Sequence, residues 1–127
     1  RKSLSKVHLG AAIAYLQTQT KETKEKWDSL LQLYNRLLQI EYSPMAALNR
    51  TYALSKANGK ADAIKEAEKL NLSENHLYHS LLGNLYTDID NTKAINHLQT
   101  ALSLAKTSAD KAVLASGIAS LKTELEK

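Results

Sequence analysis

The sequence lacks cysteine and phenylalanine, and its 127 residues include one proline and four glycines. Without cysteine, neither a disulfide framework nor a thiolate metal site can form, which suits a reducing compartment. The longest apolar run falls far short of the roughly 20 residues that a membrane-spanning helix needs. No signal-peptide pattern opens the chain. These absences predict a cytoplasmic protein with no membrane segment, long enough to bury a core without a disulfide or a metal.

Scarce proline and glycine, with abundant alanine, leucine, lysine, glutamate and glutamine, favour helix along the whole chain. Apolar residues recur at steps of three and four, the spacing of an amphipathic helix. Helices are expected over residues 4–18, 24–40, 44–57, 61–70, 75–87, 92–106 and 108–127. The pattern predicts an all-α fold of about seven helices in antiparallel hairpins. One domain is expected over residues 1–127, in which residues 1–26 form a first helix and a basic linker.

The apolar stripes also predict which faces are buried. The first helix has one stripe through Val7 and Tyr15 and another through Leu9 and Ile13, so it should pack between other helices. The third helix should bury Met45, Leu48 and Tyr52. The apolar face of the fifth should consist of Leu77, Leu81, Leu82 and Leu85.

The net charge of +4 is concentrated at one end of the chain. Residues 1–26 hold six basic and two acidic residues, whereas residues 27–127 hold eleven of each. Nucleic-acid-binding domains usually gather lysine and arginine on one face of the fold. This distribution therefore argues against direct binding of DNA or RNA by the chain.

A search for catalytic, cofactor or metal motifs finds none. The glycines are isolated, so there is no phosphate-binding loop, and no serine stands in a nucleophile elbow. His76 and His79 are three residues apart on one expected helix, but no third metal ligand accompanies them. We therefore expect no enzyme activity, no cofactor, no metal and no small-molecule substrate.

One segment resembles the tetratricopeptide repeat (TPR) pattern, a pair of helices that stacks into a right-handed superhelical array. Its packing positions are Gly83, Tyr86, Ala94, Leu98 and Ala101. The pattern places a small residue on each helix where the two cross most closely, here Gly83 and Ala94. Small residues can also pack any helix pair. The two interpretations give the same fold class and differ on whether a concave binding groove exists.

A longer stretch resembles a known family. Trp27, Leu30, Leu33, Tyr34, Leu37 and Leu38 precede the string Ser43-Pro44-x-x-Ala47-Leu48-Asn49-Arg50. Together they are similar to the C-terminal, TPR-like extension of one group of bacterial ECF-type RNA polymerase sigma factors. The chain begins at Arg1 without a methionine, which predicts a fragment of a longer protein.

The resemblance implies a regulatory or protein-interaction domain that acts in transcription initiation and has no chemistry of its own. Its expected partner is a protein: the factor's own sigma domains, the RNA polymerase core or a regulator. Promoter DNA would be bound only by the N-terminal domains of the parent protein. The alternative is a free-standing TPR-like scaffold that binds a peptide and has no part in transcription.

Four residues match the family pattern and are not needed to explain an apolar stripe: Asn49, Arg50, Tyr78 and His79. Arginine and tyrosine are frequent at the energetic centres of interfaces. The four residues are therefore predicted to form a partner surface on the third and fifth helices. The alternative is that their side chains hydrogen-bond between helices and fix the packing.

Overall fold

The computed structural model describes residues 2–127, with side chains described from Lys6 onward. The described chain contains seven helices and no strand, which confirms the predicted all-α array. The helices are α1 (Lys2–Gln17), α2 (Lys24–Ile40), α3 (Pro44–Asn58), α4 (Lys60–Glu68), α5 (His76–Tyr86), α6 (Asn91–Leu104) and α7 (Ser108–Leu125). Among residues 2–127, no helix combines the length and the apolar character needed to cross a membrane.

Local sequence explains where most helices begin. Five of them have an N-cap side chain that accepts a hydrogen bond from a backbone N–H of the first turn: Thr23, Ser43, Asn75, Asp90 and Thr107. Such caps satisfy donors that the helix itself leaves without a partner. Pro44 follows Ser43 at the first position of α3, where proline loses no hydrogen bond. At the other end of α3, Gly59 adopts a φ of 101°, a conformation that glycine alone adopts without strain.

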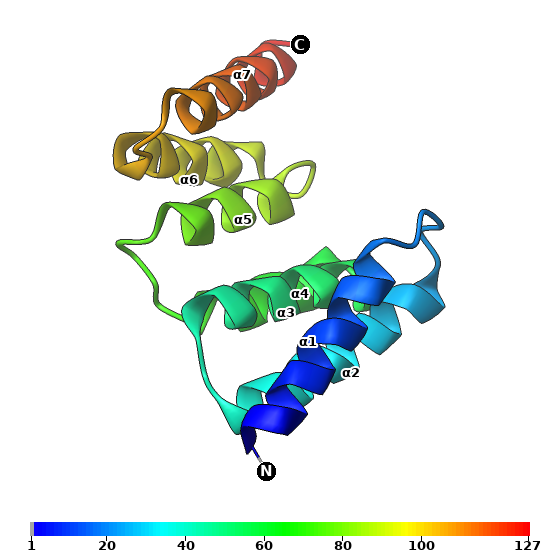
Figure 1. The fold of residues 1–127 in the computed structure, drawn as a ribbon. Coiled ribbons are helices and arrows are strands. Elements are labelled where there is room, and N and C mark those ends of the chain that lie inside the picture. Colours follow the sequence, from blue (N-terminus) through cyan, green and yellow to red (C-terminus); the bar gives the residue numbers. More distant parts are fainter. Residues whose placement is uncertain (1) are drawn as a thin grey trace. The chain divides into compact units, whose positions relative to one another are not determined.

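The chain forms two compact units, Arg1–Ala63 and Ile64–Lys127, with the boundary inside α4. The single domain expected over residues 1–127 stays a prediction. In the first unit α2 packs against both α1 and α3 (Figure 1). Its core contains Ile13, Leu30, Tyr34 and Ala53, with Trp27 and several leucines packed around them.

In the second unit α6 lies between α5 and α7 and packs against both (Figure 1). Between α6 and α7 the core consists of Ala101, Ala105 and Leu114, flanked by Leu98. Helices α5 and α6 lie close together at Gly83. A Cβ atom there would lie 3.2 Å from the Ala94 carbonyl oxygen and 2.5 Å from Leu98 Cδ2.

Several predicted core residues are in fact exposed. Val7 and Tyr15 of α1 face solvent, so α1 packs through the stripe of Leu9 and Ile13 only. On α3 the core face consists of small residues with Leu48 and Leu54, and this face leaves Met45 and Tyr52 exposed. The apolar pattern overestimated burial because leucine, methionine and aromatic residues often keep part of their surface in water.

Substituting Gly83 with alanine should destabilise the fold. The added methyl group would overlap Leu98, and overpacking of this kind costs about 1–3 kcal/mol. The higher helix propensity of alanine offsets at most about 1 kcal/mol of that cost. Urea unfolding of Gly83→Ala should therefore give a lower free energy of unfolding than the wild type.

Gly117→Ala is the matched control. A Cβ at Gly117 would also face Leu98, but at 3.6 Å, an ordinary contact distance. This variant should be as stable as the wild type or slightly more stable. Equal stability of Gly83→Ala and Gly117→Ala would contradict a close α5–α6 contact at Gly83.

Candidate functional site

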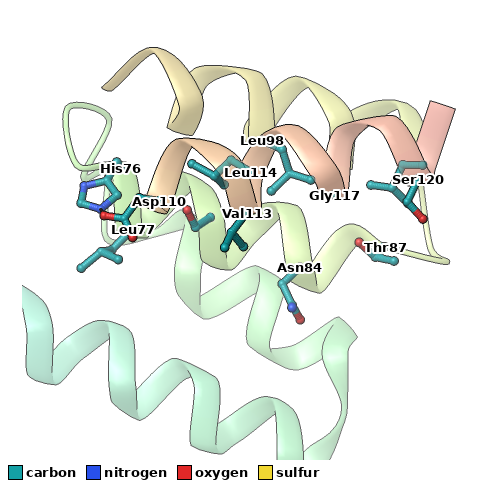
Figure 2. Close-up of a pocket in the computed structure, with 12 residues that line it drawn as sticks. His76, Leu77, Asn84, Thr87, Leu98, Asp110, Val113, Leu114, Gly117 and Ser120 are labelled. Carbon is teal, nitrogen blue, oxygen red and sulfur yellow. Dashed lines mark ion pairs between the residues drawn. The ribbon is translucent and has the colours of Figure 1, made fainter. Parts of the chain in front are cut away.

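The second unit contains a groove of about 460 Å³. Helices α5 and α7 form its walls, and Leu98 of α6 lies in its floor (Figure 2). The groove is lined by His76, Leu77, Ser80, Asn84, Thr87, Leu98, Asp110, Val113, Leu114, Gly117, Ser120 and Leu121. On each wall the lining residues, single or in adjacent pairs, recur every three or four residues, so one face of α5 and one face of α7 build the groove.

The groove combines exposed apolar side chains with uncharged polar ones. Val113 is 72% exposed and Leu77 is 37% exposed, although Leu77 was expected in the core. Ser80 and Asn84 add hydroxyl and amide groups on the α5 wall. Neighbouring apolar side chains that are exposed on a concave surface often mark an interaction site.

The two ends of the groove differ in charge. At one end His76 Nε2 lies 3.8 Å from Asp110 Oδ2, and this pair joins α5 to α7 (Figure 2). At the opposite end lie Thr87 and Ser120, which are uncharged (Figure 2). The lining thus holds one carboxylate beside His76, and its other side chains are uncharged and suited to an apolar or weakly polar ligand.

Of the predicted partner surface, Asn49 and Arg50 lie on α3 in the first unit. Arg50 Nε donates a hydrogen bond of 2.6 Å to Asn35 Oδ1 on α2. Asn49 is exposed and hydrogen-bonds the phenol of Tyr34, which also accepts a bond from Gln17. Burial raises the pKa of Tyr34, and these two hydrogen bonds oppose part of the rise. Both predicted residues thus join α3 to α2, as the packing alternative expects.

Tyr78 and His79 lie on the inner side of α5. Both are buried, His79 to 9% exposure, and their rings meet edge to face with centroids 5.1 Å apart. Burial raises the pKa of the Tyr78 phenol, and the negative charge of Glu68 adds to the rise. The groove lies on the other face of the same helix. Tyr78 and His79 therefore offer little surface to a partner, and the packing alternative describes them better.

The first unit has a smaller hollow of about 250 Å³ beside Trp27, Tyr52 and Asn49. The ammonium group of Lys26 lies in this hollow, at the place where an aromatic ring, a carbonyl oxygen and a carboxylate converge. It lies 5.0 Å from the Trp27 ring centroid, 2.9 Å from the Gln19 carbonyl oxygen and 3.5 Å from a Glu22 carboxylate oxygen. Lys26 belongs both to the predicted basic linker and to the helix predicted from residue 24, and it is buried in the first turn of α2. This hollow is an internal ion site and leaves no place for a ligand cation.

The repeat-packing residues lie at the contacts of α6, with Gly83 and Ala94 facing each other between α5 and α6 and Ala101 in the core between α6 and α7. Ala94 and Ala101 are fully buried, and Gly83 contacts the α6 backbone and Leu98. Tyr86 is buried beside them, and its hydroxyl donates a 2.8 Å hydrogen bond to Glu68 Oε2. Burial raises the pKa of Tyr86 to about 12. The hydrogen bond to Glu68 and the negative charges of Glu68 and Asp90 contribute further.

Two functional features were not found from the sequence. Val113 was missed because it lies beside the stripe of Leu114, Ile118 and Leu121 and not in it. The second feature is the contact between His79 and His97, whose Nδ1 atoms are 3.1 Å apart. Eighteen residues separate these histidines, so local sequence spacing does not predict their contact.

Within residues 2–127 no three histidine or carboxylate side chains are grouped so that they could hold a metal ion.

No protein-family model matches the sequence. Among curated proteins, an uncharacterized protein of Rhizobium meliloti (strain 1021) is 31% identical over 108 residues. The aligned part is 82% of this chain and 26% of that protein. The chain therefore spans about a quarter of the length of the relative it matches. Because that protein is uncharacterized, the likeness assigns no activity or partner.

The buried phenol of Tyr86 predicts a loss of stability in alkali. Tyrosine in the unfolded chain ionises near pH 10, whereas Tyr86 in the fold ionises near 12. Folding therefore favours the neutral phenol of Tyr86. The resulting contribution to the free energy of unfolding is fully present below pH 10 and is lost as the pH rises towards 12. Tyr86→Phe should remove part of this alkaline loss. It should also cost about 1 kcal/mol at neutral pH, because the bond to Glu68 is gone.

The measurement is urea unfolding between pH 7 and 12, with Tyr15→Phe as the control because the Tyr15 side chain is exposed. The control should follow the wild-type profile. An alkaline profile of Tyr86→Phe identical to the wild type would show that Tyr86 ionises freely in the fold.

Proposed function

We propose that this chain is a protein-interaction region of an ECF-type RNA polymerase sigma factor and that its groove between α5 and α7 binds a protein partner. The partner is one of the factor's own sigma domains, the RNA polymerase core or a regulator. The region acts in the cytoplasm during transcription initiation. It carries out no reaction itself and does not contact promoter DNA, which the parent protein binds through other domains.

The groove is the observation that carries the interaction role. Two helix faces at regular spacing leave Val113 and Leu77 open to water beside hydroxyl and amide groups. A protein segment can cover such a surface with apolar side chains and satisfy the polar groups at its rim. Alternate helices of TPR-like arrays form this kind of wall, and α5 and α7 are alternate in the chain.

The affiliation with sigma factors rests on the resemblance described above. The string from Ser43 to Arg50 is supported as a structural unit, because each polar residue has a defined contact. Ser43 caps α3, Pro44 begins it, and Arg50 bonds to Asn35 across the α2–α3 hairpin. The balanced charge of residues 27–127 is also in keeping with a partner other than nucleic acid.

The interaction role is tested with Val113→Glu in the full-length parent protein. A carboxylate at this position would be buried by a bound partner at a large cost in free energy. We expect at least a roughly tenfold loss of partner binding, equivalent to about 1.4 kcal/mol. Because Val113 is mostly exposed in the free chain, the melting temperature should stay unchanged.

Ile89→Glu serves as the matched control. Ile89 is also exposed, at 54%, belongs to the same unit and does not line the groove. The measurements are co-purification with RNA polymerase core, promoter-dependent transcription and thermal melting. Equal transcription by the two variants would contradict the role of the groove. If the wild-type protein neither co-purifies with the RNA polymerase core nor supports promoter-dependent transcription, the sigma affiliation is contradicted and a free-standing peptide-binding scaffold is favoured.

A further inference from the structure

His79 of α5 and His97 of α6 form a hydrogen-bonded pair inside the second unit. Their Nδ1 atoms are 3.1 Å apart, and their rings are stacked with centroids 5.3 Å apart at an angle of 29°. His79 Nε2 lies 2.8 Å from the carbonyl oxygen of Ser73, in the connection between α4 and α5. The pair therefore ties α5 both to α6 and to this connection.

These contacts fix which nitrogen of each neutral ring carries its proton. A carbonyl oxygen can only accept, so His79 Nε2 must donate to Ser73. In the neutral ring His79 Nδ1 then has a lone pair and is the acceptor. His97 must therefore donate from Nδ1, which leaves its own Nε2 without a proton.

The pair can take up one proton without breaking. A proton added at His97 Nε2 leaves the bond from His97 Nδ1 in place and makes the donor cationic. A second proton would have to bind His79 Nδ1, which is the acceptor of that bond. The second proton thus removes the bond and places two cations in stacked rings with centroids 5.3 Å apart.

Aromatic rings and two charged groups surround the pair, and burial disfavours a positive charge on His97. Tyr86 of α5 stacks on His97 with ring planes 8° apart, and Tyr78 meets His79 edge to face. Burial lowers the pKa of His97, and the proximity of His79 lowers it further. Glu68 of α4 opposes this shift, whereas Lys93 of α6 adds to it. The charged groups around the pair are therefore one acid and one base.

We propose that His79 and His97 act as a proton-controlled latch, which holds α5 to α6 and to the connection at Ser73 when it carries no more than one proton and opens when it carries two. The direction of the response follows from linkage. A histidine in the open chain titrates near pH 6.5, so below that pH the open form binds more protons than the closed form. The latch is closed above about pH 6.5 and weakens as the pH falls. This device is independent of any partner in the groove.

Nitrogen NMR of the imidazole rings in the full chain tests the proton arrangement at pH 8. We expect the Nε2–H tautomer for His79 and the Nδ1–H tautomer for His97. An isolated histidine favours Nε2–H, so the tautomer of His97 is diagnostic. Finding His97 as Nε2–H would overturn the proposal, because it could not then donate to His79.

Unfolding in urea between pH 5.5 and 7.5 tests the response to acid. We compare the wild type with His97→Asn, whose amide can donate from a similar position but does not titrate, and with His8→Asn, because His8 is exposed. In the wild type the unfolding constant should rise as the pH falls, by up to about tenfold per pH unit for each proton taken up. His97→Asn should lower that slope by about one proton, and His8→Asn should leave it unchanged. Equal pH dependence of the unfolding constant in the wild type and His97→Asn would overturn the latch. If His97→Asn fails to fold, the NMR measurement of the two histidine tautomers still decides the proposal.

Discussion

Helix α6 lies so close to α5 at Gly83 that a side chain there would collide with Leu98 and crowd the Ala94 carbonyl group. Much of the second unit depends on this approach. It brings His97 within hydrogen-bonding distance of His79 and places the ring of Tyr86 flat against His97. It also sets the depth at which Leu98 lies in the groove floor. A wider separation of the two helices would remove the histidine bond and the ring stacking together, because both act over short distances.

The two faces of α5 differ in their surroundings: one packs inside the second unit, and the other lines the groove. The inner face carries Tyr78, His79 and Tyr86. His79 contacts Ser73 and His97, and the Tyr86 hydroxyl contacts Glu68. The described residues contain no buried polar side-chain atom that lacks a hydrogen-bond partner. The outer face carries the groove residues, which remain accessible to another molecule. A rigid, satisfied inner face is what allows the outer face to keep a fixed shape for recognition.

The first unit is held by a different kind of contact. Side-chain hydrogen bonds from Arg50 to Asn35 and from Gln17 to Tyr34 link neighbouring helices. Lys26 is buried as a cation between an aromatic ring, a backbone carbonyl group and a carboxylate. These polar contacts link α1, α2 and α3, and Arg50 and Asn49 of the predicted partner surface take part in them. The groove of the second unit remains the better candidate for recognition, because Val113 and Leu77 on its walls are exposed.

The sequence by itself determined the number of helices and most of their bounds, because caps, glycine, proline and apolar periodicity act over a few residues. It also located the small residues Gly83, Ala94 and Ala101, since the repeat pattern is defined by spacing along the chain. The apolar stripes correctly placed Ile13, Leu48 and Leu82 in the core, but only the tertiary structure decided how far each buried face extends. Leu77 proved exposed and its neighbours Tyr78 and His79 buried, because a satisfied polar ring packs as well as an aliphatic chain. The histidine pair and the groove likewise depend on contacts between helices, and no rule of local spacing encodes those contacts.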